Sequence, residues 1–275
     1  MTDPAAALDA IGRLPDAEID IAGAAIQFAR IDTPDADWQA AEAHLSELAR
    51  RAVAAAATET DATMANRARA LKRIICDEFG YAGDTETYDD LANANLIRVI
   101  ERRKGLPVAL GIIWLHMARA AGWPAHGVDF PGHFLVALED RTSRLMLDVF
   151  NAGHVLEARE LRAMIKRAHG TRIELHPDMI ASMSTREVLL RLQNNILTRR
   201  GAAEDLTGAL TCCEAMLKIA PDRADLWRSA GLLNRRLEHV GAALSCFERS
   251  LELVQERDMA ARLRATIDEL RMRLN

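Results

Sequence analysis

The chain has 275 residues, of which 49% are hydrophobic, and a formal net charge of −5 with acidic and basic residues interspersed. This length and apolar content allow a core of its own, which excludes a disordered polypeptide, and the charge offers no electrostatic footprint for nucleic acid or anionic lipid. Aromatic residues make up only 4% of the chain, a composition that favours helices packed through small residues over a large all-β architecture.

The sequence predicts neither export nor insertion into a membrane. The first residues, MTDPAAALDA, contain no basic region followed by an apolar core, and no segment reaches the roughly 18 uninterrupted apolar residues of a membrane span. The cysteines lack CxxC spacing, which suggests neither a zinc site nor a disulfide framework. We therefore expect a cytoplasmic protein whose thiols are reduced. They are Cys76, Cys212, Cys213 and Cys246.

The first predicted elements are amphipathic helices. Between residues 16 and 79 the apolar pattern predicts three, separated at Thr33-Pro34-Asp35 and around residues 58–61, and the third ends at Gly80. Residues 81–95 are polar and rich in turn formers, so they are expected to form a connecting loop that can border a site.

The centre of the chain is predicted to hold a buried helix followed by antiparallel strands. Pro107 opens the run VALGIIWLHMARAA, which is apolar on nearly every face and is stopped by Gly122. Three short runs typical of strands follow at 125–130, 134–138 and 145–150, the last two joined by the polar linker EDRTSR.

The tail repeats itself at an offset of 34 residues, which pairs Ala209 with Ala243 and Cys213 with Phe247. Pro221 falls at the end of the first copy, where the tetratricopeptide pattern places its proline. We predict two tetratricopeptide-like hairpins and a capping helix over 258–273. Such units either pack on the rest of the chain or present a groove to a partner.

The predicted hairpin brings a histidine and an aspartate together. If its turn is symmetric, residues whose numbers sum to 283 face one another, which makes Asp148 a same-face diagonal neighbour of His133. An aspartate within LMLDVF is unfavourable unless it is paired, and such a pair is the second half of a nucleophile–His–Asp triad. The alternative is a buried hydrogen bond that only stabilises the hairpin.

Two further polar groupings have structural or functional interpretations. A metal site is conceivable because His126, His133, Asp148 and His154 fall in or beside one sheet, but no fixed ligand spacing supports it. We expect neither a metal nor a cofactor. The basic run from Arg98 to Lys104 is predicted to be a solvated helix end.

Longer phrases add a family resemblance. In order and spacing, RRKGLPVAL, GVDFPGHFLV and LDVFNAG resemble the bacterial SirB-type family, which has a helical N-terminal segment, a transglutaminase-like core and a tetratricopeptide tail. The resemblance covers most of the chain. It implies an α+β papain-like core in which a central helix carries the nucleophile at its N-terminus, against a small antiparallel sheet that carries His and Asp.

The resemblance also implies which part of the triad is missing. Active relatives open the helix with Gly-x-Cys, where the helix N-terminus lowers the thiol pKa. Aligning Gly105 with that glycine places Pro107 at the cysteine position, and a shift by one residue places Val108 there. His133 and Asp148 match the other two members. Cys76 reads as a core residue rather than as a displaced nucleophile.

These observations predict three regions: a helical segment (1–80), a transglutaminase-like core (81–185) and tetratricopeptide-like repeats with a capping helix (186–275). The leading hypothesis is a non-catalytic module that binds or regulates a protein partner through its cleft and repeat tail. Alternatives are a hydrolase that uses His133 and Asp148 to activate water against an amide or ester, and a purely structural spacer. The candidate binding residues are Asn95, Gly105, Pro107, Gly132, Asn151 and Trp227.

Overall fold

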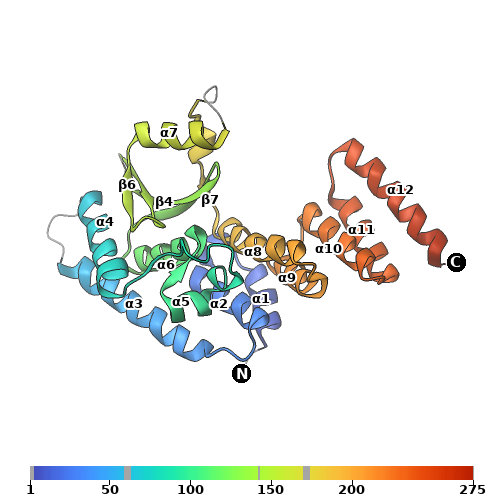
Figure 1. Ribbon diagram of the computed structural model, residues 1–275, viewed down its shortest axis with the longest axis horizontal. Coiled ribbons are helices and arrows are strands. Elements are labelled where there is room, and N and C mark those ends of the chain that lie inside the picture. Colours follow the sequence, from blue (N-terminus) through green and yellow to red (C-terminus); the bar gives the residue numbers. More distant parts are fainter. Residues whose placement is uncertain (1–2, 59–62, 142, 170–173, 275) are drawn as a thin grey trace. The chain divides into compact units, whose positions relative to one another are not determined.

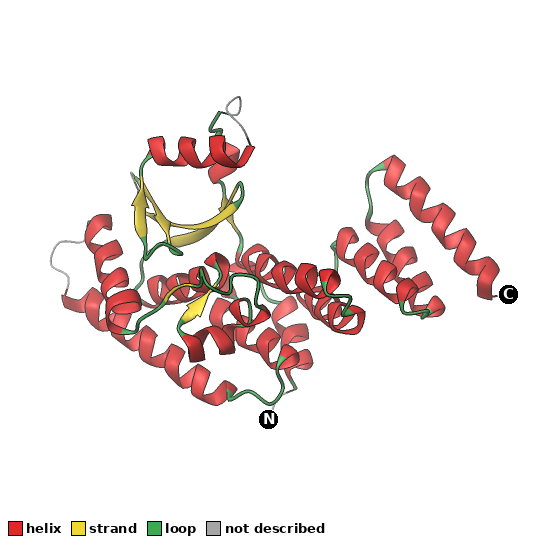
Figure 2. Cartoon of the chain, in the orientation of Figure 1, coloured by secondary structure: helices red, strands yellow, loops and turns green. Residues whose placement is uncertain are grey.

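The structure is a computed structural model that describes residues 3–58, 63–141, 143–169 and 174–274 (Figure 1). The chain forms two compact units: one spans Pro15–Leu192, and the other combines Met1–Leu14 with Gln193–Asn275. The described strands all belong to the first unit, and helices predominate in both (Figure 2). This confirms the predicted α+β class, while the division into three regions stays a prediction. No helix within the described ranges is both long and apolar enough to cross a membrane.

Four helices form the N-terminal part of the first unit. They are α2 (Ile21–Asp32), α3 (Trp38–Thr58), α4 (Met64–Lys72) and α5 (Leu96–Arg102). The first three are the predicted ones, and the predicted break at residues 33–35 is confirmed; most of the second predicted break lies at 59–62, outside the described residues. A π-helical turn (Arg73–Glu78) continues α4 to Gly80, whose φ of 72° ends the helix as expected for a glycine.

A half-buried histidine on α3 lies beside an arginine. The ring of His44 lies 2.8 Å (Nε2) from Nη1 of Arg103, which also donates to the Tyr81 hydroxyl at 2.7 Å. Burial, followed by the Arg103 charge, lowers the pKa of His44 to about 4. The folded chain therefore holds this imidazole neutral at the pH where an unfolded chain would protonate it.

We expect stability to fall as the pH drops from about 6.5 to about 4, because the unfolded state binds the His44 proton first. His44 is half-buried and therefore partly screened, so its contribution is about 1–2 kcal/mol. Urea unfolding of the wild type and of His44→Gln at both pH values checks this, since glutamine keeps an acceptor for Arg103 without titrating. An equal pH dependence in the two proteins would show that His44 is not the group responsible.

A five-stranded antiparallel sheet forms the rest of the first unit. Its order is β6 (His154–Leu156), β5 (Arg144–Asp148), β4 (His133–Glu139), β3 (Ala125–Phe130) and β7 (Ser182–Met183). On one face lies the predicted central helix, α6 (Pro107–Ala120), where a Cβ on Gly111 would lie 2.2 Å from the Phe134 ring. The helix is buried almost throughout because its sequence is apolar on every side.

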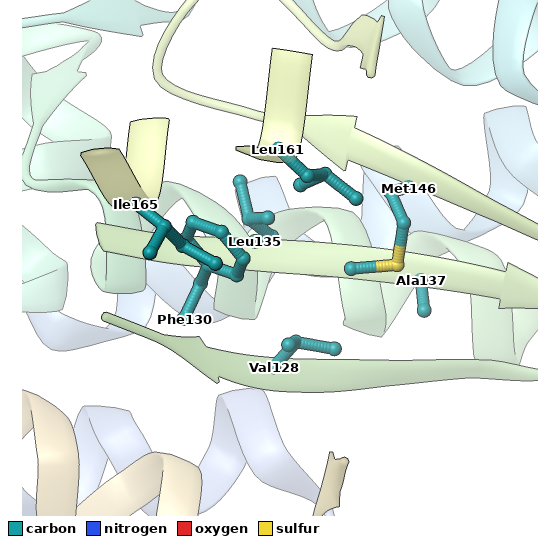
Figure 3. Close-up of a cluster of buried hydrophobic side chains, with 7 residues drawn as sticks. All are labelled: Val128, Phe130, Leu135, Ala137, Met146, Leu161 and Ile165. Carbon is teal, nitrogen blue, oxygen red and sulfur yellow. The ribbon is translucent and has the colours of Figure 1, made fainter. Parts of the chain in front are cut away.

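The other face of the sheet is covered by α7 (Ala158–His169) (Figure 1). Figure 3 shows Leu161 and Ile165 of this helix above side chains of β3, β4 and β5. Leu135 and Ala137 lie in this cluster, whereas Phe134 points to α6, as the alternation of side chains along a strand requires. The two faces of the sheet are thus covered by different helices, one by α6 and the other by α7.

The second unit is built of helical hairpins. Its elements are α8 (Thr185–Ala202, which begins in the first unit), α9 (Leu206–Ile219), α10 (Ala224–Arg236), α11 (Val240–Leu253) and α12 (Arg257–Leu274). The two predicted hairpins and the capping helix are confirmed. Ala209 and Ala243, which the 34-residue offset pairs, are both 0% exposed. Gly231 lies under Phe247, whose ring would be 2.8 Å from an added Cβ.

A helix at the N-terminus, α1 (Pro4–Gly12), completes this second unit and was not predicted. It packs on α9: Asp9 pairs with Lys218 at 3.0 Å, and Gly12 lies so close to the Lys218 carbonyl that an added Cβ would be 2.1 Å from it. Segments from opposite ends of the sequence therefore share one core.

Candidate functional site

The hairpin of β4 and β5 has the predicted register. Val136 pairs with Leu147 and Glu139 with Arg144, so each pair sums to 283. The same register brings His133, the first residue of β4, beside Asp148, the last residue of β5. The predicted His–Asp contact is confirmed, with 2.9 Å between His133 Nε2 and Asp148 Oδ1.

Asp148 is buried and its carboxylate is well supplied with donors. Besides the His133 ring, Oδ1 accepts the backbone N–H groups of Phe150 (3.2 Å) and Asn151 (3.3 Å), and Oδ2 accepts the Asn151 side-chain amide at 2.6 Å. Burial alone would raise the pKa of Asp148, but the hydrogen bonds from His133 and Asn151 outweigh it and hold this pKa below its ordinary value. The carboxylate is therefore ionised at neutral pH and orients the imidazole.

His133 is less deeply buried than its partner. Its side chain is 18% exposed, against 7% for Asp148. Because Nε2 faces Asp148, Nδ1 is the ring nitrogen that remains for a second partner, and none of the described residues is bonded to it. The pair is thus neither sealed under side chains nor fully open.

One aromatic ring, that of Phe150, lies against His133, and a second, that of Tyr88, lies against Phe150. The register inferred from the sequence had placed Phe150 opposite His133, but it gave no such place to Tyr88. Phe150 lies edge-on to the imidazole with centroids 6.5 Å apart, and Tyr88 lies edge-on to Phe150 at 5.9 Å. Tyr88 is 45% exposed, so the row of rings leads from solvent to His133. The only sign of Tyr88 in the sequence was the prediction that residues 81–95 form a loop that can border a site.

The loop that carries Tyr88 is held by a buried aspartate. Asp84 accepts the Thr87 amide and hydroxyl at 2.9 and 2.7 Å and Nη2 of Arg102 at 2.7 Å. The hydrogen bonds from Thr87 hold the pKa of Asp84 well below its usual range. Arg102 also bonds Asn93 at 3.0 Å. The prediction of a solvated helix end was therefore wrong for Arg102, because a carboxylate distant in sequence pairs with it.

The start of α6 lies beyond Phe150 and offers no nucleophile. A Cβ on Gly83 would lie 2.5 Å from the Phe150 ring, and Gly83, in β1 (Ala82–Gly83), pairs with Gly105 of β2 (Lys104–Gly105), just before Pro107. Pro107 and Val108 are both buried. Neither side chain can attack a carbonyl, so the expected cysteine position is chemically inert.

The thiols elsewhere in the chain are poor substitutes. All four are free. Burial raises the pKa of Cys76 to about 11 and that of Cys213 to about 12, the reverse of what activates a nucleophile.

The remaining candidate binding residues fall into two groups. Gly132, in the β3–β4 turn, and Asn151, bonded to Asp148, lie at the His–Asp pair. Asn95 is buried away from it and donates to Asp32 at 3.0 Å and Thr33 at 3.2 Å, and Trp227, in the second unit, donates to the Pro221 carbonyl at 2.8 Å.

The four residues considered for a metal do not converge. His126 pairs with Glu139 at 3.3 Å, and His154 with Glu160 at 2.9 Å. Among the residues that the structure describes, no three His, Cys, Asp or Glu side chains are placed to hold a metal ion.

Two parts of the chain match different families of known proteins. Residues 39–194 match the transglutaminase-like superfamily, and residues 200–274 match a tetratricopeptide repeat. A UPF0162 protein of Xylella fastidiosa is 33% identical over 190 residues, which cover 67% of this chain and 66% of that protein, just under two thirds of its length. The UPF0162 protein of Vibrio cholerae is 29% identical over 86% of this chain and 87% of its own.

More distant similarities extend beyond bacteria. Human F-box only protein 21 is 25% identical over 57% of this chain, but only 26% of that protein is covered. Among solved structures, a crystal structure of menin overlaps at 10% identity and a TM-score of 0.44, over 91% of this chain and 70% of that chain. That score is too low to support an argument.

Proposed function

We propose that this chain, which belongs to the transglutaminase-like superfamily and is of the SirB type, is a non-catalytic module that binds or regulates a protein partner through its core site and its repeat tail. The combination of a transglutaminase-like domain with tetratricopeptide repeats confers a capacity for protein interaction. One observation supports the proposal that the module is non-catalytic. His133 and Asp148 are present and paired, but a buried Pro107 stands at the start of the helix. The compartment in this proposal is the cytoplasm, which keeps free thiols reduced.

Affinity capture with the full-length chain tests the proposal. His133→Ala removes the surface-reaching part of the core site, and Trp227→Ala alters the repeat surface. The matched control is His126→Ala, which removes a half-exposed histidine from the same sheet, away from Asp148. We expect a reproducible partner that is lost with His133→Ala or Trp227→Ala and retained with His126→Ala. A capture pattern that none of these changes affects would contradict the proposal.

A hydrolase is the second candidate, because His133 is oriented by an ionised carboxylate and its side chain is partly exposed. Such a pair can act as a general base toward water without a protein nucleophile. This candidate requires turnover of an amide or ester panel that His133→Ala abolishes and His126→Ala leaves unchanged. Turnover that persists in His133→Ala would exclude the hydrolase function.

A further inference from the structure

Helix α12 is contacted at two points by side chains of α10 and of the turn that follows α10. Near the starts of the two helices, Nη1 of Arg228 lies 3.8 Å from Sδ of Met259. Near their ends, Nη2 of Arg273 lies 2.8 Å from Oε2 of Glu238. The two helices therefore run side by side in the same direction, and residues between the two contacts on the same faces border one surface.

Helical spacing identifies those residues. On α10 the residues four and seven positions after Arg228 share its face, and on α12 the residues three, seven and ten positions after Met259 do the same. We call this set the arginine strip. It consists of Arg228, Leu232, Arg235, Arg262, Thr266 and Glu269.

The arginines of the strip differ from others in the second unit. Arg223, Arg249 and Arg271 each form an ion pair with a carboxylate within 2.7 Å. Arg228, Arg235 and Arg262 have no carboxylate partner among the described residues. Among the described residues, the strip thus carries three guanidinium groups without an ion pair, against the carboxylate of Glu269 and that of Asp258, one turn before Arg262.

An exposed apolar side chain lies among these charges. Leu232 is 41% exposed and sits one turn from both Arg228 and Arg235. The two arginines are seven residues apart, or about 10 Å along the helix axis. An extended peptide spans about that distance in three residues, so carboxylates at positions i and i+3 match the two guanidinium groups.

We propose that the arginine strip binds an acidic peptide segment in which one apolar side chain rests on Leu232 and flanking carboxylates pair with Arg228, Arg235 and Arg262. The inference rests on the proposed function, because it names the chemistry of the partner segment that the repeat tail recognises. The contact is electrostatic and exposed, so its affinity decreases with ionic strength.

Fluorescence anisotropy with the full-length chain tests this. The probe is a short labelled peptide of Glu-Ser-Leu-Glu units, and its control replaces each Glu by Gln. We expect binding at about 50 mM NaCl that weakens about tenfold in the Gln peptide and at about 300 mM NaCl. Arg235→Glu and Arg262→Glu are each expected to weaken it about tenfold.

The matched control variant is Arg264→Glu, which makes the same charge change on the same helix. Arg264 lies on the opposite side of α12, in the groove with Leu251 and Ile267. Binding within about twofold of wild type is expected there. Absent binding, equal weakening by Arg264→Glu, or equal binding of a single-stranded oligonucleotide would overturn the inference. A partner captured through His133 that persists in Arg262→Glu would leave the proposed function standing.

Discussion

Replacing Gly153 by alanine is expected to lower the free energy of unfolding by about 2–4 kcal/mol. Gly153 has a φ of 67°, which is unfavourable for any residue with a Cβ. The added Cβ would also lie 2.2 Å from the ring of Trp114, a side chain that is only 1% exposed. The unfavourable φ and the clash with Trp114 both displace the turn that follows Asp148. We therefore expect the hydrogen bond between His133 and Asp148 to be distorted.

A second glycine separates the effect of the positive φ from the effect of the clash with Trp114. Gly80 has a similar φ of 72°, yet no atom of the described residues lies within 4 Å of an added Cβ. Gly80→Ala should therefore lose only about 1 kcal/mol. Urea unfolding followed by circular dichroism measures both variants. Equal losses for Gly80→Ala and Gly153→Ala would mean that the turn does not pack on Trp114.

Replacing Asp148 by alanine is expected to lower stability by about 3 kcal/mol at neutral pH. The change leaves two backbone N–H groups, those of Phe150 and Asn151, without their acceptor, and takes a partner from His133. Asp148→Asn keeps an oxygen for these donors and should lose about half as much. Urea unfolding midpoints of the three proteins give the comparison.

The pH dependence of the Asp148→Ala effect follows from its lowered pKa. A carboxyl whose folded pKa is below the unfolded value stabilises fully above the unfolded value, about 3.9, and loses this contribution as the pH falls through the folded pKa. The difference between wild type and Asp148→Ala should therefore shrink in acid. A difference that stays constant down to pH 2 would argue against an ionised Asp148.

His133→Ala should behave differently from Asp148→Ala. Among the described residues the imidazole makes one hydrogen bond, and it is partly exposed, so its removal should cost at most about 1 kcal/mol. Stability at this site thus depends mainly on Asp148, and the His133 variant remains folded enough for binding and turnover assays.

Local patterns were sufficient to predict the hairpin and the repeats. The register followed from a polar linker of even length between two apolar runs, and the 34-residue offset followed from small and large apolar residues recurring in a fixed order. In both cases the interacting residues are close in sequence, where spacing restricts geometry strongly.

The same reasoning did not identify contacts between distant segments. The pairing of Arg102 with Asp84, the row formed by Tyr88 and Phe150, and the packing of α1 on α9 join residues whose local patterns carry no sign of one another. A charged or aromatic residue on a loop is compatible with solvent exposure until a partner from elsewhere in the chain covers it.

The family resemblance of the sequence implied a transglutaminase-like core and placed the expected nucleophile at residue 107 or 108, where none stands. The sequence by itself determined that His133 lies beside Asp148 and that the tail is a repeat. These properties depend on residue identity and on short-range periodicity. Only the tertiary structure decided that His133 is partly exposed, that Tyr88 lies against Phe150, and that three arginines of the tail have no carboxylate partner among the described residues. Exposure and charge neutralisation depend on which distant segments meet in space, and no local pattern encodes that.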